Sequence, residues 1–356
     1  MLAYDVGFGI NLDRAEEVLA AQAGGGDRAQ REVLPHSRRS PRYFGYRPSP
    51  LRIMRQAKSV HVADRETDAM VTLTAFDFGA VSIAYTIPID GPVHALPQLS
   101  EALYENAQLL ADSRAHAGSL LDLIRAAVLK PKLMPFVEDY VVFRGKRLEC
   151  GAQPIEEYFE GERAIIAAIV RAETGPLSRQ EITDATRTCI SYSPTDAAVI
   201  DWNAAILIGD DMEDAQAVLE FANVELLEMR FLDDQLDRAL ETAYAATGVA
   251  PRAFWNRKGM ATLRDIAGLQ MDSALLFETV NNTLKLLGDQ HLARIYRAAA
   301  EQLHIPDWDA SIIRKLGTLE SIYAKLIDRQ STRRMEVLEW IVILLIAFEI
   351  VTSFQH

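Results

Sequence analysis

Acidic side chains in two short stretches are the residues of this sequence best suited to metal chemistry. Asp210 and Asp211 stand directly before Glu213 and Asp214, and Asp201 lies a short distance upstream. Carboxylate oxygens are ligands that Mg²⁺ prefers, so Asp201, Asp210 and Asp211 would suit a metal-dependent hydrolase of nucleotides or phosphoesters. The alternative is that these acids begin a helix, where a capping Asp and acids in the first turn are stabilising. We favour this alternative and expect neither a catalytic residue nor a metal site here.

Other sequence patterns that would predict an enzyme are absent. The chain has no glycine-rich phosphate-binding loop with its lysine, no dinucleotide-binding fingerprint and no nucleophile elbow. Its histidines are never spaced three or four residues apart, so no helix presents a pair of metal ligands. The two cysteines, Cys150 and Cys189, fit a reducing compartment without a disulfide framework. We therefore expect a protein that is not an enzyme and uses no cofactor.

A run of positive charge near the N-terminus stands out, because the whole chain has a formal net charge of −13. Nine basic side chains and one acidic side chain lie between residues 28 and 58, with prolines and aromatic residues interleaved. Arginine beside aromatic rings suits RNA or anionic lipid headgroups, so a ribosome or a membrane surface is the expected partner. The alternative is an arm that packs its aromatic residues on the next domain. The candidate contact residues are Arg38, Arg39, Arg42, Tyr43 and Arg47.

The C-terminal segment is apolar enough to cross a membrane. Residues 337–354 include only two charged side chains, and as a helix they would be roughly 27 Å long, close to the ~30 Å of a hydrocarbon core. Basic residues precede this segment, which favours a single-pass C-terminal anchor with the bulk of the chain in the cytoplasm. The alternative is a buried helix within a soluble oligomer. The residues that define the predicted anchor are Glu339, Trp340, Leu344 and Glu349.

The spacing of apolar residues predicts an α+β fold in which a mixed region precedes long helices. Ser178, with Glu181 three residues later, predicts the capping box of one helix. The expected strands of the mixed region are 60–63, 70–74, 80–87, 136–143 and 197–208, and its expected helices are 96–129, 155–172 and 178–190. Later helices are expected over 212–246, 260–287 and 292–303. Asp233, Asp234 and Asp237 fall on the polar face of the first of these later helices and are expected to be solvated.

A last helix, beginning near Asp309, has apolar residues at alternating steps of four and three. They are Ile312, Leu316, Leu319, Tyr323 and Leu326. This heptad stripe needs a partner, and we expect both the 260–287 helix folded back and another copy of the chain. The predicted organisation is a basic, proline-rich arm (1–58), a mixed α/β domain (59–208), a helical region with a coiled-coil-like hairpin (209–335) and a C-terminal transmembrane helix (336–354).

Three short motifs resemble the required-for-meiotic-nuclear-division family. They are Glu339-Trp340 followed by an aliphatic run with a late Glu349, Phe76-x-x-Gly79, and Phe221-Ala222-Asn223. The family has Arg before its Leu-Glu-Trp, whereas this chain has Val337. The resemblance implies a membrane-associated scaffold, linked in the animal member to translation by the mitochondrial ribosome. We therefore expect a non-enzymatic, membrane-anchored scaffold that oligomerises through its C-terminal helices and links translation machinery or other partners to the membrane.

Overall fold

The computed structural model describes residues 1–21, 28–31, 49–146, 155–210, 212–248, 290–322 and 324–325. The chain divides into two compact units. The first comprises Met1–Phe231 and Leu276–Trp308, and the second comprises Leu232–Leu275 and Asp309–His356. The described residues combine several β-sheets with α-helices, which confirms the mixed α and β composition that the sequence predicts.

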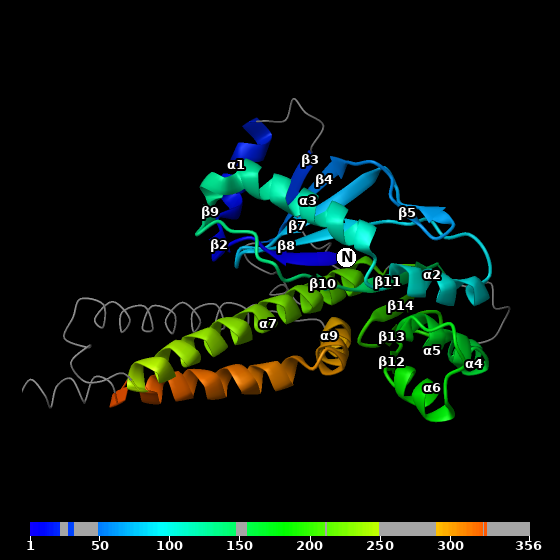
Figure 1. Cartoon of the computed structure of the whole chain (residues 1–356). Helices are drawn as coiled ribbons and strands as arrows, with labels where there is room; N and C mark the ends of the chain where they lie inside the picture. The colour runs from blue at the N-terminus through cyan, green and yellow to red at the C-terminus, as the bar shows by residue number, and fades with distance from the viewer. Residues whose placement is uncertain are drawn as a thin grey trace, which may run out of the picture. The chain divides into compact units, whose positions relative to one another are not determined.

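A six-stranded antiparallel sheet forms the N-terminal part of the first unit (Figure 1). Its strands, in spatial order, are β10 (Glu138–Asp139), β1 (Leu2–Asp5), β8 (Ala80–Tyr85), β7 (Met70–Ala75), β4 (Leu51–Gln56) and β3 (Arg28–Arg31). One face is apolar and lies under helices α1 (Leu12–Ala21) and α3 (Ala107–Ile124), as Figure 1 shows. The fully buried side chains Tyr4, Leu73 and Ile83 belong to this core.

The predicted irregular arm over residues 1–58 is instead largely regular where the structure describes it. It contributes β1, α1, β3 and β4, and β1 pairs on both sides within the sheet. Strand β1 is only four residues long and is buried throughout, so it shows no alternation that a pattern search could detect. Residues 38, 39, 42, 43 and 47, which are the candidate contacts of the arm, lie outside the described residues.

A second sheet has the order β11-β14-β13-β12. Its strands are β11 (Val141–Gly145), β14 (Ala204–Ile208), β13 (Ala197–Ile200) and β12 (Cys189–Ile190), with β11 parallel to β14. The predicted single strand 197–208 is therefore wrong, because residues 201–203 make a tight turn and the Asp201 N–H donates to the Ala204 carbonyl at 3.1 Å. Asp201 and Asn203, on either side of Trp202, are residue types that favour a turn and are unfavourable in the middle of a buried strand.

Helices on both sides of this second sheet complete the first unit. Helices α2 (Leu96–Leu103), α4 (Ile155–Gly161), α5 (Arg163–Arg171) and α6 (Arg179–Ala185) contribute to the core on one side. The start of α7 (Glu213–Gly248) and α9 (Gln290–Gln302) contribute to the core on the other. Ser178 caps α6, and its hydroxyl accepts the Glu181 N–H at 3.1 Å, which confirms the predicted cap.

The predicted helix 96–129 is two helices in the structure. Helix α2 ends before Tyr104, and Asn106 begins α3 by accepting the N–H groups of Gln108 and Leu109. The side-chain amide of Asn106 also donates to the Ala102 carbonyl at 2.8 Å, so one residue joins the end of one helix to the start of the next. Shorter elements complete the unit: β2 (Gly9–Ile10), β5 (His61–Val62), β6 (Arg65–Glu66), β9 (Val128–Leu129), η1 (Val93–Ala95) and η2 (Arg125–Ala127).

In the second unit, the far end of α7 runs beside a helix over residues 309–322, in the same direction (Figure 1). The Nζ atom of Lys315 lies 2.7 Å from Asp233 Oδ1 and 2.6 Å from Asp237 Oδ1. Asp233 is therefore a packed, paired residue and not a solvated one. The partner that the structure gives to the predicted heptad stripe is α7, and the 260–287 helix lies outside the described residues.

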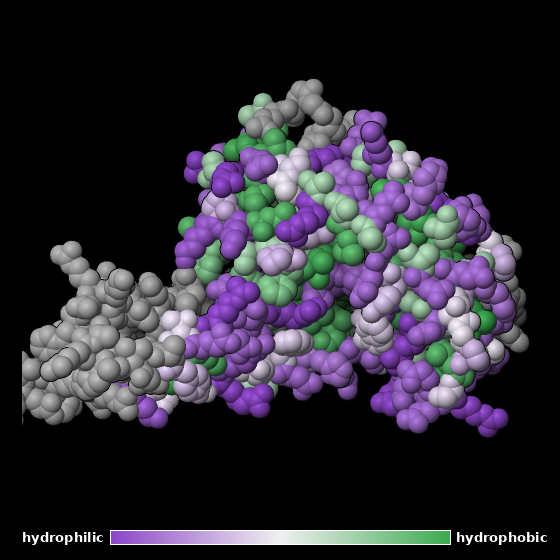
Figure 2. All heavy atoms as spheres, in the orientation of Figure 1, coloured by the Kyte–Doolittle hydropathy of each residue, from purple (hydrophilic) through white to green (hydrophobic). Residues whose placement is uncertain are grey.

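The predicted membrane helix lies wholly outside the part of the chain that the structure describes. Residues 336–354, with Glu339, Trp340, Leu344 and Glu349, lie outside them. Within the part of the chain that the structure describes, no helix is long and apolar enough to cross a membrane. Figure 2 shows hydrophilic side chains over most of the described face, with hydrophobic side chains visible in separate groups.

Candidate functional site

The second face of the six-stranded sheet is polar and yet buried. Directly paired residues of antiparallel strands point to the same face, so the strand register places a row of side chains across the sheet. Arg52 pairs with Thr74, Thr74 with Ser82, Ser82 with Ala3, and Ala3 with Glu138. Thr74 is 1 % exposed and Ser82 is fully buried. Buried hydroxyl groups are normally hydrogen-bonded, so a polar row of this kind is a candidate for function as well as for packing.

Helix α7 lies against this polar face and adds acidic residues to it. The Asn223 side chain donates to the Glu138 carbonyl at 3.2 Å, and Arg230 forms an ion pair with the Glu138 carboxylate. Phe221 packs edge-on against Phe76 and Phe78 in the turn between β7 and β8, with ring centroids 6.3 Å apart in each pair. These contacts fix the position of α7 on the sheet, so its buried acids also have fixed positions.

Asp5 and Glu228 form the most deeply buried acidic pair. Asp5 is 3 % exposed, and its Oδ1 accepts the Gly7 N–H at 2.9 Å. Glu228 is 1 % exposed, and neither of its carboxyl oxygens has a hydrogen-bond partner in the described structure. Burial raises the pKa of Asp5 to about 7. Burial, followed by the charge of Asp5, raises the pKa of Glu228 well above its ordinary value. Near neutral pH this pair therefore holds at least one proton.

Glu138 shows the same effect in a paired carboxyl group. Burial raises the pKa of Glu138 to about 7, although the charge of Arg230 acts in the opposite direction. Protonated carboxyl groups at neutral pH are able to act as general acids when a substrate reaches them. Asp5, Glu138 and Glu228 are not among the lining residues of either of two clefts in the described part of the chain.

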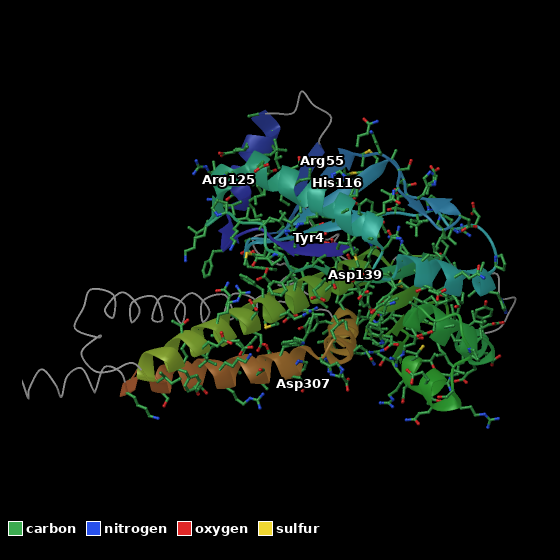
Figure 3. All side chains as sticks on the ribbon, viewed as in Figure 1. Tyr4, Arg55, His116, Arg125, Asp139 and Asp307 are labelled. Atoms are coloured by element: carbon green, nitrogen blue, oxygen red, sulfur yellow. The ribbon has the colours of Figure 1, made fainter. Side chains whose placement is uncertain are left out.

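The polar face opens to solvent at a cleft of about 190 Å³. The cleft lies between the two sheets of the first unit, and its walls include Arg52, Thr72, Asp139, Gln216 and Glu220. Figure 3 shows Asp139 where β10, β11 and the start of α7 come together. Burial raises the pKa of the Asp139 carboxyl group. A concave site with apolar walls and a few convergent polar groups is the usual form of a small-molecule site.

The proposed hydrolase residues do not come together. Asp201 is 1 % exposed in the turn between β13 and β14, where its Oδ2 lies 2.7 Å from Arg171 Nε. Asp210 is exposed beyond the other end of β14, and that five-residue strand separates the two by roughly 13 Å or more. Asp211 lies outside the described residues. The chain as described contains no group of three or more His, Cys, Asp or Glu residues placed to hold a metal ion.

Sequence reasoning missed the residues that the structure brings together. Asp5 and Glu228 are 223 residues apart along the chain, Asp139 and Glu220 are 81 residues apart, and no motif connects the members of either pair. One available signal was the first half of α7, where Glu220, Glu225 and Glu228 stand among apolar residues on every side of the helix. A helix that is apolar all round is buried, so its acids must be buried too.

Comparison with known proteins gives a family without a described activity. One curated relative is "Uncharacterized protein MJ0711" of Methanocaldococcus jannaschii, which is 21 % identical over 204 residues. The aligned region is 56 % of this chain and 61 % of the relative, so the chain spans less than two thirds of the relative's length. No solved structure matches this chain.

A family model described as "Uncharacterized protein MJ0711, N-terminal domain" matches residues 1–215. The resemblance to the required-for-meiotic-nuclear-division family is therefore wrong, because both comparisons point to a different family. The matched region contains both sheets and most of the cleft, including Asp139. Since the match covers more than half of the sequence, the chain belongs to the MJ0711 N-terminal domain family.

Proposed function

We propose that this chain is a non-enzymatic scaffold that self-associates through the helices of its second unit and is held at a membrane by residues 336–354. The observation that carries the proposal is the apolar stripe of the last described helix. Ile312 and Leu319 are fully buried seven residues apart, and Ile322 is 7 % exposed. A seven-residue repeat is typical of helices that associate side by side.

Polar contacts hold this helix against α7 and leave apolar side chains on the outside. The Ser311 hydroxyl donates to Asp233 Oδ1 at 3.2 Å, next to the Lys315 ion pairs. Burial acts to lower the pKa of Lys315, but the hydrogen bonds that Lys315 donates to Asp233 and Asp237 raise it above its ordinary value. Ile313 on this helix is 57 % exposed. A second copy of the same helix is the occupant that we propose for the side that carries Ile313.

The membrane part of the proposal rests on the sequence. Residues 337–354 contain twelve strongly apolar side chains, which together favour insertion by roughly 4–7 kcal/mol before the two glutamates are counted. The basic stretch that contains Arg38, Arg39 and Arg42 supplies a second contact in this proposal, either with anionic lipid headgroups or with ribosomal RNA. The anchor would hold the chain at a membrane, and the basic stretch would contact either that membrane surface or a ribosome near it.

Membrane extraction tests the anchor. The double variant Leu344→Lys/Ile346→Lys adds about 5–7 kcal/mol to insertion at the helix centre, which is comparable to the whole favourable sum. We expect the unchanged protein to stay in the membrane pellet after a carbonate wash and the double-lysine variant to move to the supernatant. The control variant Leu344→Val/Ile346→Val should stay in the pellet. Equal release of all three proteins would contradict the anchor.

Chemical crosslinking tests self-association independently of the membrane. Ile313→Lys places a charge in the proposed contact, whereas Ser321→Lys places the same charge on an exposed polar position of the same helix. We expect Ile313→Lys to abolish crosslinked dimers and larger species, and Ser321→Lys to leave them unchanged. An unchanged pattern for both variants would rule out this face of the helix as the contact.

A further inference from the structure

Two exposed aromatic side chains from distant parts of the sequence pack on each other at the surface of the first unit. Tyr104 lies in the turn between α2 and α3, and Trp202 lies in the turn between β13 and β14. Their rings meet edge-on with centroids 6.0 Å apart, and the two residues are still 42 % and 41 % exposed. Single exposed hydrophobic residues are normal on a protein surface, whereas exposed tyrosine and tryptophan side by side are typical of the centre of an interface.

A hydrogen bond and an ion pair join the elements that carry these rings. The Ser100 hydroxyl of α2 is buried and donates to the Ile169 carbonyl of α5 at 2.6 Å. Beside Trp202, the buried Asp201 carboxylate lies 2.7 Å from the guanidinium group of Arg171, the last residue of α5. Helix α5 therefore connects the end of α2 to the β13–β14 turn, and a partner would find both rings already in place.

Exposed glutamates surround the aromatic pair. Glu105 follows Tyr104 directly, and burial and then the charge of Glu105 raise the pKa of the Tyr104 hydroxyl group. Glu101, one helical turn before Tyr104, accepts a hydrogen bond from the Thr174 hydroxyl at 3.2 Å. This contact brings Glu173 to the same end of α2. Glu101, Glu105 and Glu173 are all exposed, so their charges face solvent and any approaching partner.

The positive side chains of this region are fewer than its acids. Arg171 lies 2.7 Å from Asp201 and 3.4 Å from Glu181, so its charge is matched. Arg179, two residues before Glu181, is exposed. These two arginines face the three exposed glutamates, Glu181 and Asp201. The excess of negative charge remains even when Asp201, whose pKa burial raises to about 6, is protonated.

Two further groups near Tyr104 do not change this balance. Asp139 is close enough for its charge to act on the Tyr104 hydroxyl group, and the α-amino group of Met1 lies close to Asp139. Burial raises the pKa of Asp139 and lowers the pKa of the Met1 amino group, so both groups shift toward their neutral forms. When both are ionised, their charges are opposite. The surface around Tyr104 and Trp202 is therefore negative near neutral pH.

The chemistry of this surface fits arginine. A guanidinium group is planar, stacks on aromatic faces and donates two parallel hydrogen bonds to a carboxylate, so it is able to use the rings and the glutamates together. Nucleic acid, anionic lipid or a second copy of the same surface would bring like charge to a chain whose formal net charge is already −13. Charge complementarity thus favours a basic protein segment over these alternatives.

We infer that the surface formed by Tyr104, Trp202 and the surrounding glutamates Glu101, Glu105 and Glu173 docks an arginine-rich segment of a partner protein, with guanidinium groups stacked on the two rings. This inference does not depend on the scaffold proposal, because all of these residues belong to the first unit. It gives the first unit a protein partner of its own.

Fluorescence anisotropy of a labelled hexa-arginine peptide, titrated with the full chain, tests the inference. Hexa-lysine carries the same charge but lacks the planar group, and we expect it to bind several-fold more weakly. Trp202→Ala should weaken hexa-arginine binding by about fivefold, whereas Trp202→Phe, which keeps a ring, should retain most of it. Tyr192→Ala removes a 65 % exposed aromatic residue near the other end of β13, and it should change the affinity by less than about twofold.

A second pair of variants separates the local acids from the net charge of the chain. Glu105→Gln and Glu213→Gln each remove one negative charge, and Glu213 lies beyond the other end of β14. We expect Glu105→Gln to weaken hexa-arginine binding by about threefold and Glu213→Gln to leave it nearly unchanged. Equal binding of the two peptides, equal effects of Trp202→Ala and Tyr192→Ala, or absence of hexa-arginine binding by the unchanged protein would overturn the inference.

Discussion

Substitution of Asp5 by Asn gives a direct measurement of what a buried carboxyl group contributes to the stability of this fold. Asp5 ends β1, is 3 % exposed and faces the carboxyl group of Glu228. Asn has nearly the same shape, and its side-chain oxygen is able to accept the same hydrogen bond from the Gly7 N–H. The substitution therefore removes the titrating proton and the charge and leaves most of the packing.

The magnitude follows from the pKa of Asp5, which rises from 3.8 to about 7 on folding. Burial is the main cause, and the Gly7 hydrogen bond and Lys132 act in the opposite direction. Between these two pKa values the folded state keeps a proton that the unfolded state has released, so the free energy of unfolding falls as the pH rises. The difference corresponds to about 4 kcal/mol. This contribution is fully favourable below about pH 4 and is lost by about pH 8.

Urea unfolding of both proteins at several pH values from about 4 to 8 is the assay. The measured quantity is the free energy of unfolding of Asp5→Asn minus that of the unchanged protein, since titrating groups that do not interact with Asp5 cancel in this difference. Glu228 does interact with Asp5, so the difference reports the titration of the pair. We expect the difference to rise by about 4 kcal/mol across this pH range in favour of the variant. The exposed Asp64→Asn serves as the control for the loss of one carboxylate. A constant difference for Asp5→Asn, or one that falls with pH, would refute the reasoning.

Two further substitutions test contacts that hold the first unit together. Gly79 has φ +108°, and a Cβ atom there would lie 1.8 Å from the Gly7 carbonyl oxygen, so Gly79→Ala should destabilise the protein by more than about 3 kcal/mol in urea unfolding. Gly91→Ala, at φ +126° with open space around it, is the control and should cost only about 1–2 kcal/mol; similar effects of the two would contradict a backbone clash. Arg171→Ala leaves the buried Asp201 carboxylate, whose pKa burial already raises to about 6, without its partner at 2.7 Å, so we expect a loss of about 3–5 kcal/mol. Arg163→Ala, which removes a more exposed ion pair with Glu160, should cost less than about 1 kcal/mol, and the idea fails if both arginine variants unfold at the same urea concentration.

Local patterns in the sequence predicted the long helices and one of their caps. Helix α7 spans Glu213–Gly248 against a predicted 212–246, and α9 spans Gln290–Gln302 against a predicted 292–303. The Ser178 cap is confirmed as well. Helix periodicity and capping depend on residues within a few positions of one another, so they are visible in one sequence.

Short strands and their register were not visible in the same way. Strand β1 has four residues, β3 has four and β10 has two, and none of them is long enough to show an alternating pattern. The polar row Arg52, Thr74, Ser82 and Glu138 exists only because five strands pair in one register. A shift of a single residue in any pair would turn these side chains to the opposite face. The candidate site therefore depends on pairing between strands that are far apart in the sequence, and the sequence alone does not show which strands pair.

Gly7, just after β1, and Gly79, in the β7–β8 turn, together fix where α7 lies on the sheet. The Gly79 position approaches the Gly7 carbonyl so closely that only hydrogen fits, and the Val6 N–H donates to the Gly79 carbonyl at 2.9 Å. This crossing fixes the end of β1, and with it Asp5, against the β7–β8 turn that presents Phe76 and Phe78 to Phe221 of α7.

The close approach of Gly79 to Gly7 therefore fixes the position of Asp5 on the sheet. It also fixes the aromatic contact that holds α7 against the sheet. Burial removes Glu220 and Glu228 from water, and this costs free energy. The aromatic contacts and the ion pair between Glu138 and Arg230 outweigh that cost and keep α7 in place.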